Sequence, residues 1–142
     1  MSTILNTLAT GLTVFSQPMV IVYMAVGVLF GMYGGAMPGI SATMAISLMV
    51  SFTYNWEMGP ALGMIIGCYV GAVYGGSRSA ILLNVPGTPS ALATTFDGYP
   101  LAMKGKAAKA LGVTAIQSVI GGIIGSIFLI VAAPLITNFA LM

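Results

Sequence analysis

Hydrophobic residues fill most of the chain in long runs, which short polar stretches separate. Near the start, Ile4, Leu8, Leu12 and Phe15 recur every three or four positions, with serine, threonine and asparagine between them. This spacing is typical of a helix with one apolar face. It predicts an amphipathic helix over residues 1–17 that lies along a membrane surface.

The longer runs carry almost no charge, and glycine and proline pairs interrupt them. A helix crosses the ~30 Å of bilayer hydrocarbon with about 20 apolar residues. The pattern therefore predicts an all-α polytopic membrane protein, folded as a single transmembrane domain over residues 1–142. Its expected spanning helices cover residues 19–37, 41–56, 58–76 and 110–134.

Residues 79–96 depart from this scheme, because Pro86 and Gly87 divide them into two short halves. Each half is about two turns, or ~10 Å, long and is too short to span. The halves form either one broken spanning helix or the arms of a re-entrant hairpin. Residues 97–109 follow as a polar loop with three lysines, which favours the cytoplasmic side. With that side fixed, a spanning element puts the N-terminus inside and a hairpin puts it outside.

The amino-acid composition limits the catalytic and binding chemistry that the chain can perform. Hydrophobic residues make up 58% of the chain and charged residues 4%, and there is no histidine. With two carboxylates in all, the chain has no catalytic triad, no acid/base carboxylate pair and no His/Cys metal cluster. These counts argue against an enzyme, a bound metal or another cofactor. A net charge of +2 is too small to indicate a nucleic-acid partner.

Two rows of glycine occur at four-residue spacing, and each row lies along one face of a predicted helix. Helices gain little by hiding apolar surface from lipid, so small residues that allow close backbone approach are their usual contact surfaces. We therefore expect the first and third spanning helices to pack through these rows, which comprise Gly27, Gly31 and Gly35 in one helix and Gly63, Gly67 and Gly71 in the other.

Candidate binding residues gather where helices are expected to begin within the membrane. Helix starts present unpaired N–H groups and a positive dipole end, which attract carboxylates. Arg78 is costly among apolar segments and is expected to face an anion or a cavity. Asn84 could equally bond the freed backbone or bind a ligand. The candidate substrate-binding residues are Ser41, Thr43, Ser77, Arg78, Asn84, Thr88 and Ser90, with the motif backbone at Pro38, Gly39, Gly75, Gly76, Pro86, Gly87 and Pro89.

The ordered motif from Gly75 through Pro89, followed by Asp97-Gly98-Tyr99-Pro100 and Ala110-Leu111-Gly112, resembles the N-terminal part of the large membrane subunit of the tripartite tricarboxylate transporter family. The turn Met37-Pro38-Gly39-Ile40 is similar to an earlier turn of that family. The resemblance implies a multi-pass permease of the bacterial inner membrane, built from two related halves as an inverted-repeat transporter fold. This chain would be part of the first half, and its apolar end also favours a fragment.

The resemblance further implies a small membrane subunit and a periplasmic solute-binding protein as partners, with citrate-like or other carboxylates carried by an ion gradient. The two Pro-Gly motifs are expected to meet near the substrate. The absence of histidine and of a mid-membrane carboxylate makes a proton relay difficult within this chain, which favours Na⁺ coupling. The alternatives are a non-transporting membrane scaffold and a channel.

Overall fold

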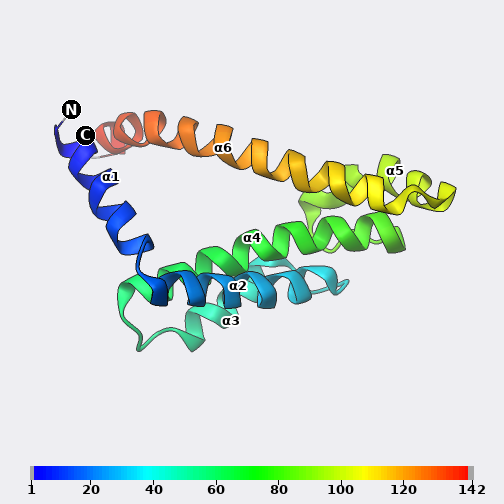
Figure 1. Cartoon of the computed structure of the whole chain (residues 1–142), viewed down its shortest axis with the longest axis horizontal. Helices are drawn as coiled ribbons and strands as arrows, with labels where there is room; N and C mark the ends of the chain where they lie inside the picture. The colour runs from blue at the N-terminus through cyan, green and yellow to red at the C-terminus, as the bar shows by residue number, and fades with distance from the viewer. Residues whose placement is uncertain (1, 141–142) are drawn as a thin grey trace.

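The computed structural model describes residues 2–140 and is helical almost throughout, with no strand in that range (Figure 1). Three helical stretches are long and apolar enough to cross a membrane, namely Pro18–Ala36, Met58–Leu83 and Pro89–Ala133. The elements are α1 (Ser2–Phe15), α2 (Pro18–Ala36), α3 (Ala42–Phe52), α4 (Met58–Leu83), η1 (Pro89–Ala91), α5 (Leu92–Leu101), η2 (Ala102–Lys106) and α6 (Ala107–Ala140).

Helices α2 and α4 form the centre of the fold and run side by side in the same direction (Figure 1). The direction follows from their contacts, because Gly67 lies against Met24 and Gly75 lies against Met32. The chain between them must therefore return across the full length of α2. That return consists of α3 with non-helical residues on both sides.

Helix α3 corrects the prediction of a spanning helix over residues 41–56. It has 11 residues, or about 17 Å at 1.5 Å per residue, which is little more than half of the hydrocarbon layer. The residues on either side of it complete the return without helical structure. Trp56 holds this segment against α2, with its ring 4.7 Å from that of Tyr23.

The end of the predicted helix over residues 58–76 is a second boundary that differs in the structure. A spanning helix was expected over residues 58–76, yet α4 continues through Gly75-Gly76 to Leu83. Glycine inside a helix costs roughly 1 kcal/mol. Here close packing offsets that cost, because Gly75 lies against Met32 and Gly76 lies against Thr88.

The segment after α4 first runs back along α4 and then turns to run in the same direction as α4 again. From Leu83 the chain returns to the level of Gly76, where Thr88 packs, and α5 then runs on until Gly98 reaches Ile81. Residues 79–96 are thus helical on both sides of the break, but the two helical parts run in the same direction and form neither one spanning helix nor a hairpin. Because α4 and α5 advance in the same direction, this segment adds no membrane crossing.

Residues 97–109 do not form the predicted loop. Helix α5 extends to Leu101, and α6 begins at Ala107 after a sharp bend in which Gly105 has φ +75°. A positive φ is accessible to glycine without a steric penalty. Helix α6 is also longer than the predicted 110–134 segment. It returns along α4 and diverges from it toward α1 (Figure 1).

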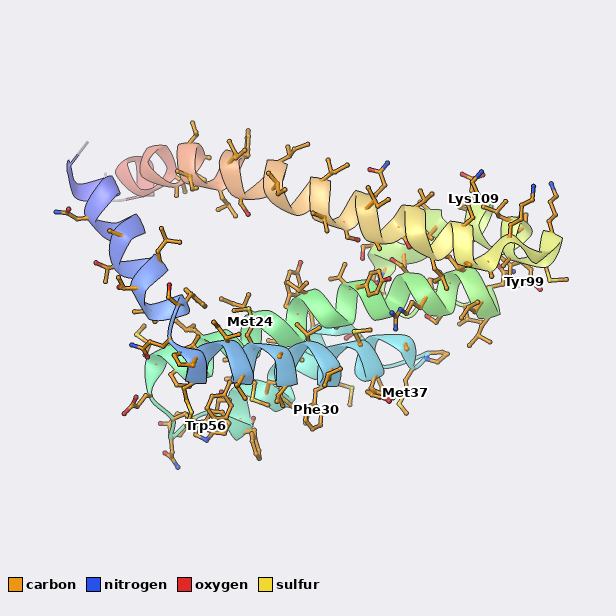
Figure 2. All side chains as sticks on the ribbon, viewed as in Figure 1. Met24, Phe30, Met37, Trp56, Tyr99 and Lys109 are labelled. Atoms are coloured by element: carbon orange, nitrogen blue, oxygen red, sulfur yellow. The ribbon has the colours of Figure 1, made fainter. Side chains whose placement is uncertain are left out.

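Most apolar side chains lie on the outside, as Phe30 and Met37 do in Figure 2. Buried hydrophobic residues are mainly those between α2, α4 and α5, including Val20, Met64, Ala72 and Ile81. A large apolar exterior around a small core of close contacts is the arrangement expected where lipid is the solvent.

Candidate substrate site at two helix breaks

The first break follows α2 and contains the first Pro-Gly pair. Residues 37–41 are non-helical, and Gly39 has φ +97°. Ser41 then caps α3, because its Oγ accepts a hydrogen bond of 3.2 Å from the backbone N–H of Met44. The Thr43 hydroxyl lies 2.6 Å from the same oxygen. Both predicted hydroxyl residues therefore stand at a true helix start.

The second break follows α4 and contains Pro86-Gly87. Asn84 ends α4 in the left-handed conformation, with φ 57° and ψ 22°. Thr88 is extended and 3% exposed, and its carbonyl accepts the N–H of Ala91. Its hydroxyl makes no capping bond and lies 3.1 Å from Ser90 Oγ. The start of η1 and α5 thus has two hydroxyls beside it.

The two breaks lie against each other. Gly87 is so close to the last turn of α2 that an added Cβ would overlap the carbonyl oxygen of Gly35. The same Cβ would lie 3.0 Å from Ser79 Oγ. On the other side, a Cβ on Gly76 would lie 2.5 Å from Thr88 Oγ1. Small residues on three segments thus let the second break enter a notch beside the end of α2.

The predicted packing rows lie between α2 and α4. A Cβ on Gly27 or Gly31 would overlap a backbone carbonyl of α4, and one on Gly67 or Gly71 would overlap a carbonyl of α2. Gly63 is looser, since its nearest neighbour is a side-chain carbon of Val20 at 2.9 Å. Gly35 and Gly75 pack in the same way at the ends of the two rows nearest the breaks, so the close packing of α2 and α4 determines where the breaks meet.

Ser77 and Arg78 require a correction. They lie within α4 and not at a helix start, so the dipole argument for an anion beside them does not hold. The Arg78 guanidinium stacks 4.7 Å from the centre of the Tyr74 ring. In the C-terminal half of a helix, the macrodipole no longer opposes a cation. Ser77 Oγ is 3.5 Å from the carbonyl oxygen of Val73.

Asn84 also has a structural explanation. Asparagine is among the few residues other than glycine that adopt the left-handed conformation at a helix end. Within the described residues, no buried side-chain nitrogen or oxygen lacks a hydrogen-bond partner. Polar groups free to meet a solute are therefore the more exposed ones at the breaks, including Thr43, Ser90 and the half-buried Arg78.

Sequence reasoning missed the inner face of η1 and α5. Thr88, Ala91, Thr95 and Gly98 are buried against neighbouring helices. Their spacing of three, four and three residues is a helical stripe of small side chains that could have revealed this contact. In the range 2–140, no group of three or more His, Cys, Asp and Glu side chains could hold a metal ion.

Together, the fold and the two breaks define an all-α polytopic membrane protein with interrupted helices in contact. Residues 21–142 match the model of the Tripartite tricarboxylate transporter TctA family, and the chain belongs to this family.

A relative in Agrobacterium vitis is 38% identical over 141 residues, which cover 99% of this chain. It is described as an uncharacterised 52.8 kDa protein in the TAR-I ttuC' 3' region, and the chain spans 28% of its length. No solved structure matches the chain. The family agrees with the resemblance seen in the sequence.

Proposed function

We propose that this chain forms part of a permease subunit that imports tricarboxylates or related carboxylates by secondary transport. The observation that carries the proposal is the contact between the two helix breaks, where Gly87 meets the last turn of α2. Irregular backbone at membrane depth persists only where protein buries it or where it lines a polar cavity. Discontinuous helices that aim their N-terminal ends at an anionic solute recur in secondary transporters.

The helix starts supply the anion-binding chemistry of the proposal. Helix α3 begins at Ser41 and Thr43, and η1 with α5 begins at Thr88 and Ser90. Their free N–H groups and the exposed hydroxyls of Thr43 and Ser90 would bind a carboxylate, and the positive dipole ends would stabilise its charge. Arg78 remains a candidate for a second carboxylate, now through its partial exposure and not through a position at a helix start.

The remaining parts of the proposal extend beyond the chain itself. We expect a small membrane subunit as partner and a periplasmic solute-binding protein that delivers the substrate in a bacterial inner membrane. We expect the coupling ion to be Na⁺, because the chain contains no histidine and only two carboxylates, which leaves little for a proton relay.

The orientation follows from the lysines. Lys104, Lys106 and Lys109 are exposed around the bend between α5 and α6. Short loops rich in lysine remain on the cytoplasmic side. Since residues 79–96 add no crossing, α2, the return through α3, and α4 bring the chain from outside to that side. The N-terminus would therefore lie outside.

The test is uptake of radiolabelled citrate into vesicles that contain the full permease and its partners, with and without a Na⁺ gradient. We expect Na⁺-dependent uptake by the wild type and its loss in Arg78→Ala, with membrane insertion unchanged. Arg78→Lys keeps the charge but loses the planar guanidinium, and should retain part of the activity. Normal uptake by Arg78→Ala would remove this arginine from the site. A complete complex that transports no carboxylate would contradict the proposed function.

A further inference from the structure

Two adjoining cavities of about 440 and 470 Å³ lie between α4 and α6. Both are lined by Val70 of α4 and Gly122 of α6, so they form one continuous groove, which we call the α4–α6 groove. It follows α6 from Ala115 to Ile130, which is about 22 Å of helix at 1.5 Å per residue. Helix α6 diverges from α4 along this length (Figure 1), and none of the described residues fills the groove.

The α6 wall of the groove has the form of a close helix contact without the second helix. Ser118, Gly122 and Ser126 line it at four-residue spacing. Between α2 and α4, glycines at this spacing lie against the backbone of the other helix, whereas a Cβ on Gly122 would meet no atom within 4 Å. Glycine weakens a helix relative to alanine. Close approach of another backbone offsets that cost, and lipid chains do not need the space.

The groove calls for an apolar occupant. Its other lining residues are mainly apolar, and they include Val28 and Met32 of α2. The Ser126 hydroxyl already donates a hydrogen bond of 2.8 Å to the carbonyl oxygen of Gly122, so it requires no polar partner. No residue from 111 to 133 is buried within the described fold, although this is the most apolar part of the chain. A spanning helix with small side chains on one face would suit this surface.

The source of such a helix follows from shape and length. Two copies related by a twofold axis pair a surface with itself, and a concave groove does not complement itself. The relative in Agrobacterium vitis, in contrast, is more than three times as long as the region that it shares with this chain. We propose that the α4–α6 groove receives a spanning helix from the part of the permease polypeptide outside these 142 residues, with its small side chains facing Gly122.

The groove also borders the candidate substrate site, and in this respect the inference rests on the proposed function. Tyr74 lines the groove, and the Arg78 guanidinium stacks 4.7 Å from the centre of the Tyr74 ring. A helix in the groove would contact Tyr74 and limit the movement of its ring. The rest of the polypeptide would thus help to position Arg78.

The test measures how often molecular oxygen, which dissolves in lipid, collides with a nitroxide spin label at Ser126→Cys. The sample is the full permease in a cysteine-free background, with one molecule per lipid nanodisc and without the small subunit or substrate. Ile124→Cys is the matched control, because Ile124 is 63% exposed, does not line the groove and lies only about 3 Å away along the helix axis. We expect a collision rate several-fold lower at Ser126→Cys than at Ile124→Cys.

Equal collision rates at the two positions would overturn the inference, because the groove would then be open to lipid. Shielding that appears only with the small subunit, or only in discs with two permeases, would also overturn it, since the occupant would then be a separate chain. The measurement needs no substrate, so shielding in single permeases supports the helix even if the complex carries no carboxylate.

A second measurement uses steric bulk. Gly122→Leu should raise the equilibrium constant for unfolding of the full permease by at least about tenfold relative to Gly121→Leu, because the larger side chain would overlap the helix in the groove. Gly121 is the control, since it does not line the groove and no atom lies within 4 Å of its added Cβ. Equal stability of these two variants would count against the packed helix.

Discussion

Replacing Gly31 by alanine tests the contact that organises the fold. Gly31 lies at one of the close contacts between α2 and α4, and its added Cβ would overlap the carbonyl oxygen of Cys68. The same Cβ would lie 2.8 Å from the backbone nitrogen of Ala72, whereas ordinary contacts are 3.4–4 Å. These neighbours are backbone atoms, which cannot rotate away. The two helices must separate.

The size of the effect follows from that separation. Relieving the overlap requires the helices to move apart by roughly 1 Å, and a gap of that size forfeits up to about half of the dispersion energy of the atoms involved. Overpacking of this kind costs about 1–3 kcal/mol. The better helix propensity of alanine returns up to ~1 kcal/mol. We therefore expect a net destabilisation of about 1–2 kcal/mol.

The matched control is Gly121→Ala on α6, where no atom lies within 4 Å of the added Cβ. This variant gains propensity without overlap and should be neutral or stabilised by up to ~1 kcal/mol. The measurement is unfolding of each full-length variant in mixed micelles by increasing dodecyl sulfate, followed by helical circular dichroism. Equal stability of the Gly31→Ala and Gly121→Ala variants would refute the close packing of α2 and α4.

Three further predictions concern the breaks and the topology. Gly87→Ala should lower carboxylate uptake by about tenfold or more, because its Cβ would push the second break away from α2; Gly121→Ala serves again as control, and equal uptake by the two would count against the notch. Asn84→Gly should retain uptake within about twofold, since glycine keeps the left-handed helix end, whereas a large loss would make the amide a ligand. In a cysteine-free background, an impermeant maleimide should label Ser2→Cys from outside and Lys106→Cys only after permeabilisation, and the reverse pattern would invert the topology.

Much of the architecture could be predicted because it depends on local properties. The lengths of the apolar runs define α1 and α2 to within a few residues, as the observed bounds Ser2–Phe15 and Pro18–Ala36 show. The non-helical backbone at both Pro-Gly pairs follows from proline's missing N–H and from glycine's freedom. The glycine rows could be read from their spacing, because four-residue periodicity places side chains on one helical face.

The candidate site could be predicted only in part. Ser41 and Thr43 do stand at a helix start, whereas Ser77 and Arg78 lie inside α4. The helix start expected at residues 77–79 is absent, because α4 continues through the Gly75-Gly76 pair to Leu83. Whether a helix continues through such a pair depends on what packs against it, and that information lies in distant residues.

The sequence alone determined that this chain is a helical membrane protein with two interruptions, because hydrophobicity and backbone freedom are properties of each residue and its near neighbours. The tertiary structure decided that α4 continues through Gly76, that residues 84–88 return toward α2, and that α6 runs back along α4. Each of these depends on contacts between segments far apart in the chain. In lipid such contacts depend on close packing between helices, and the residues of one helix do not specify which other segment packs against it.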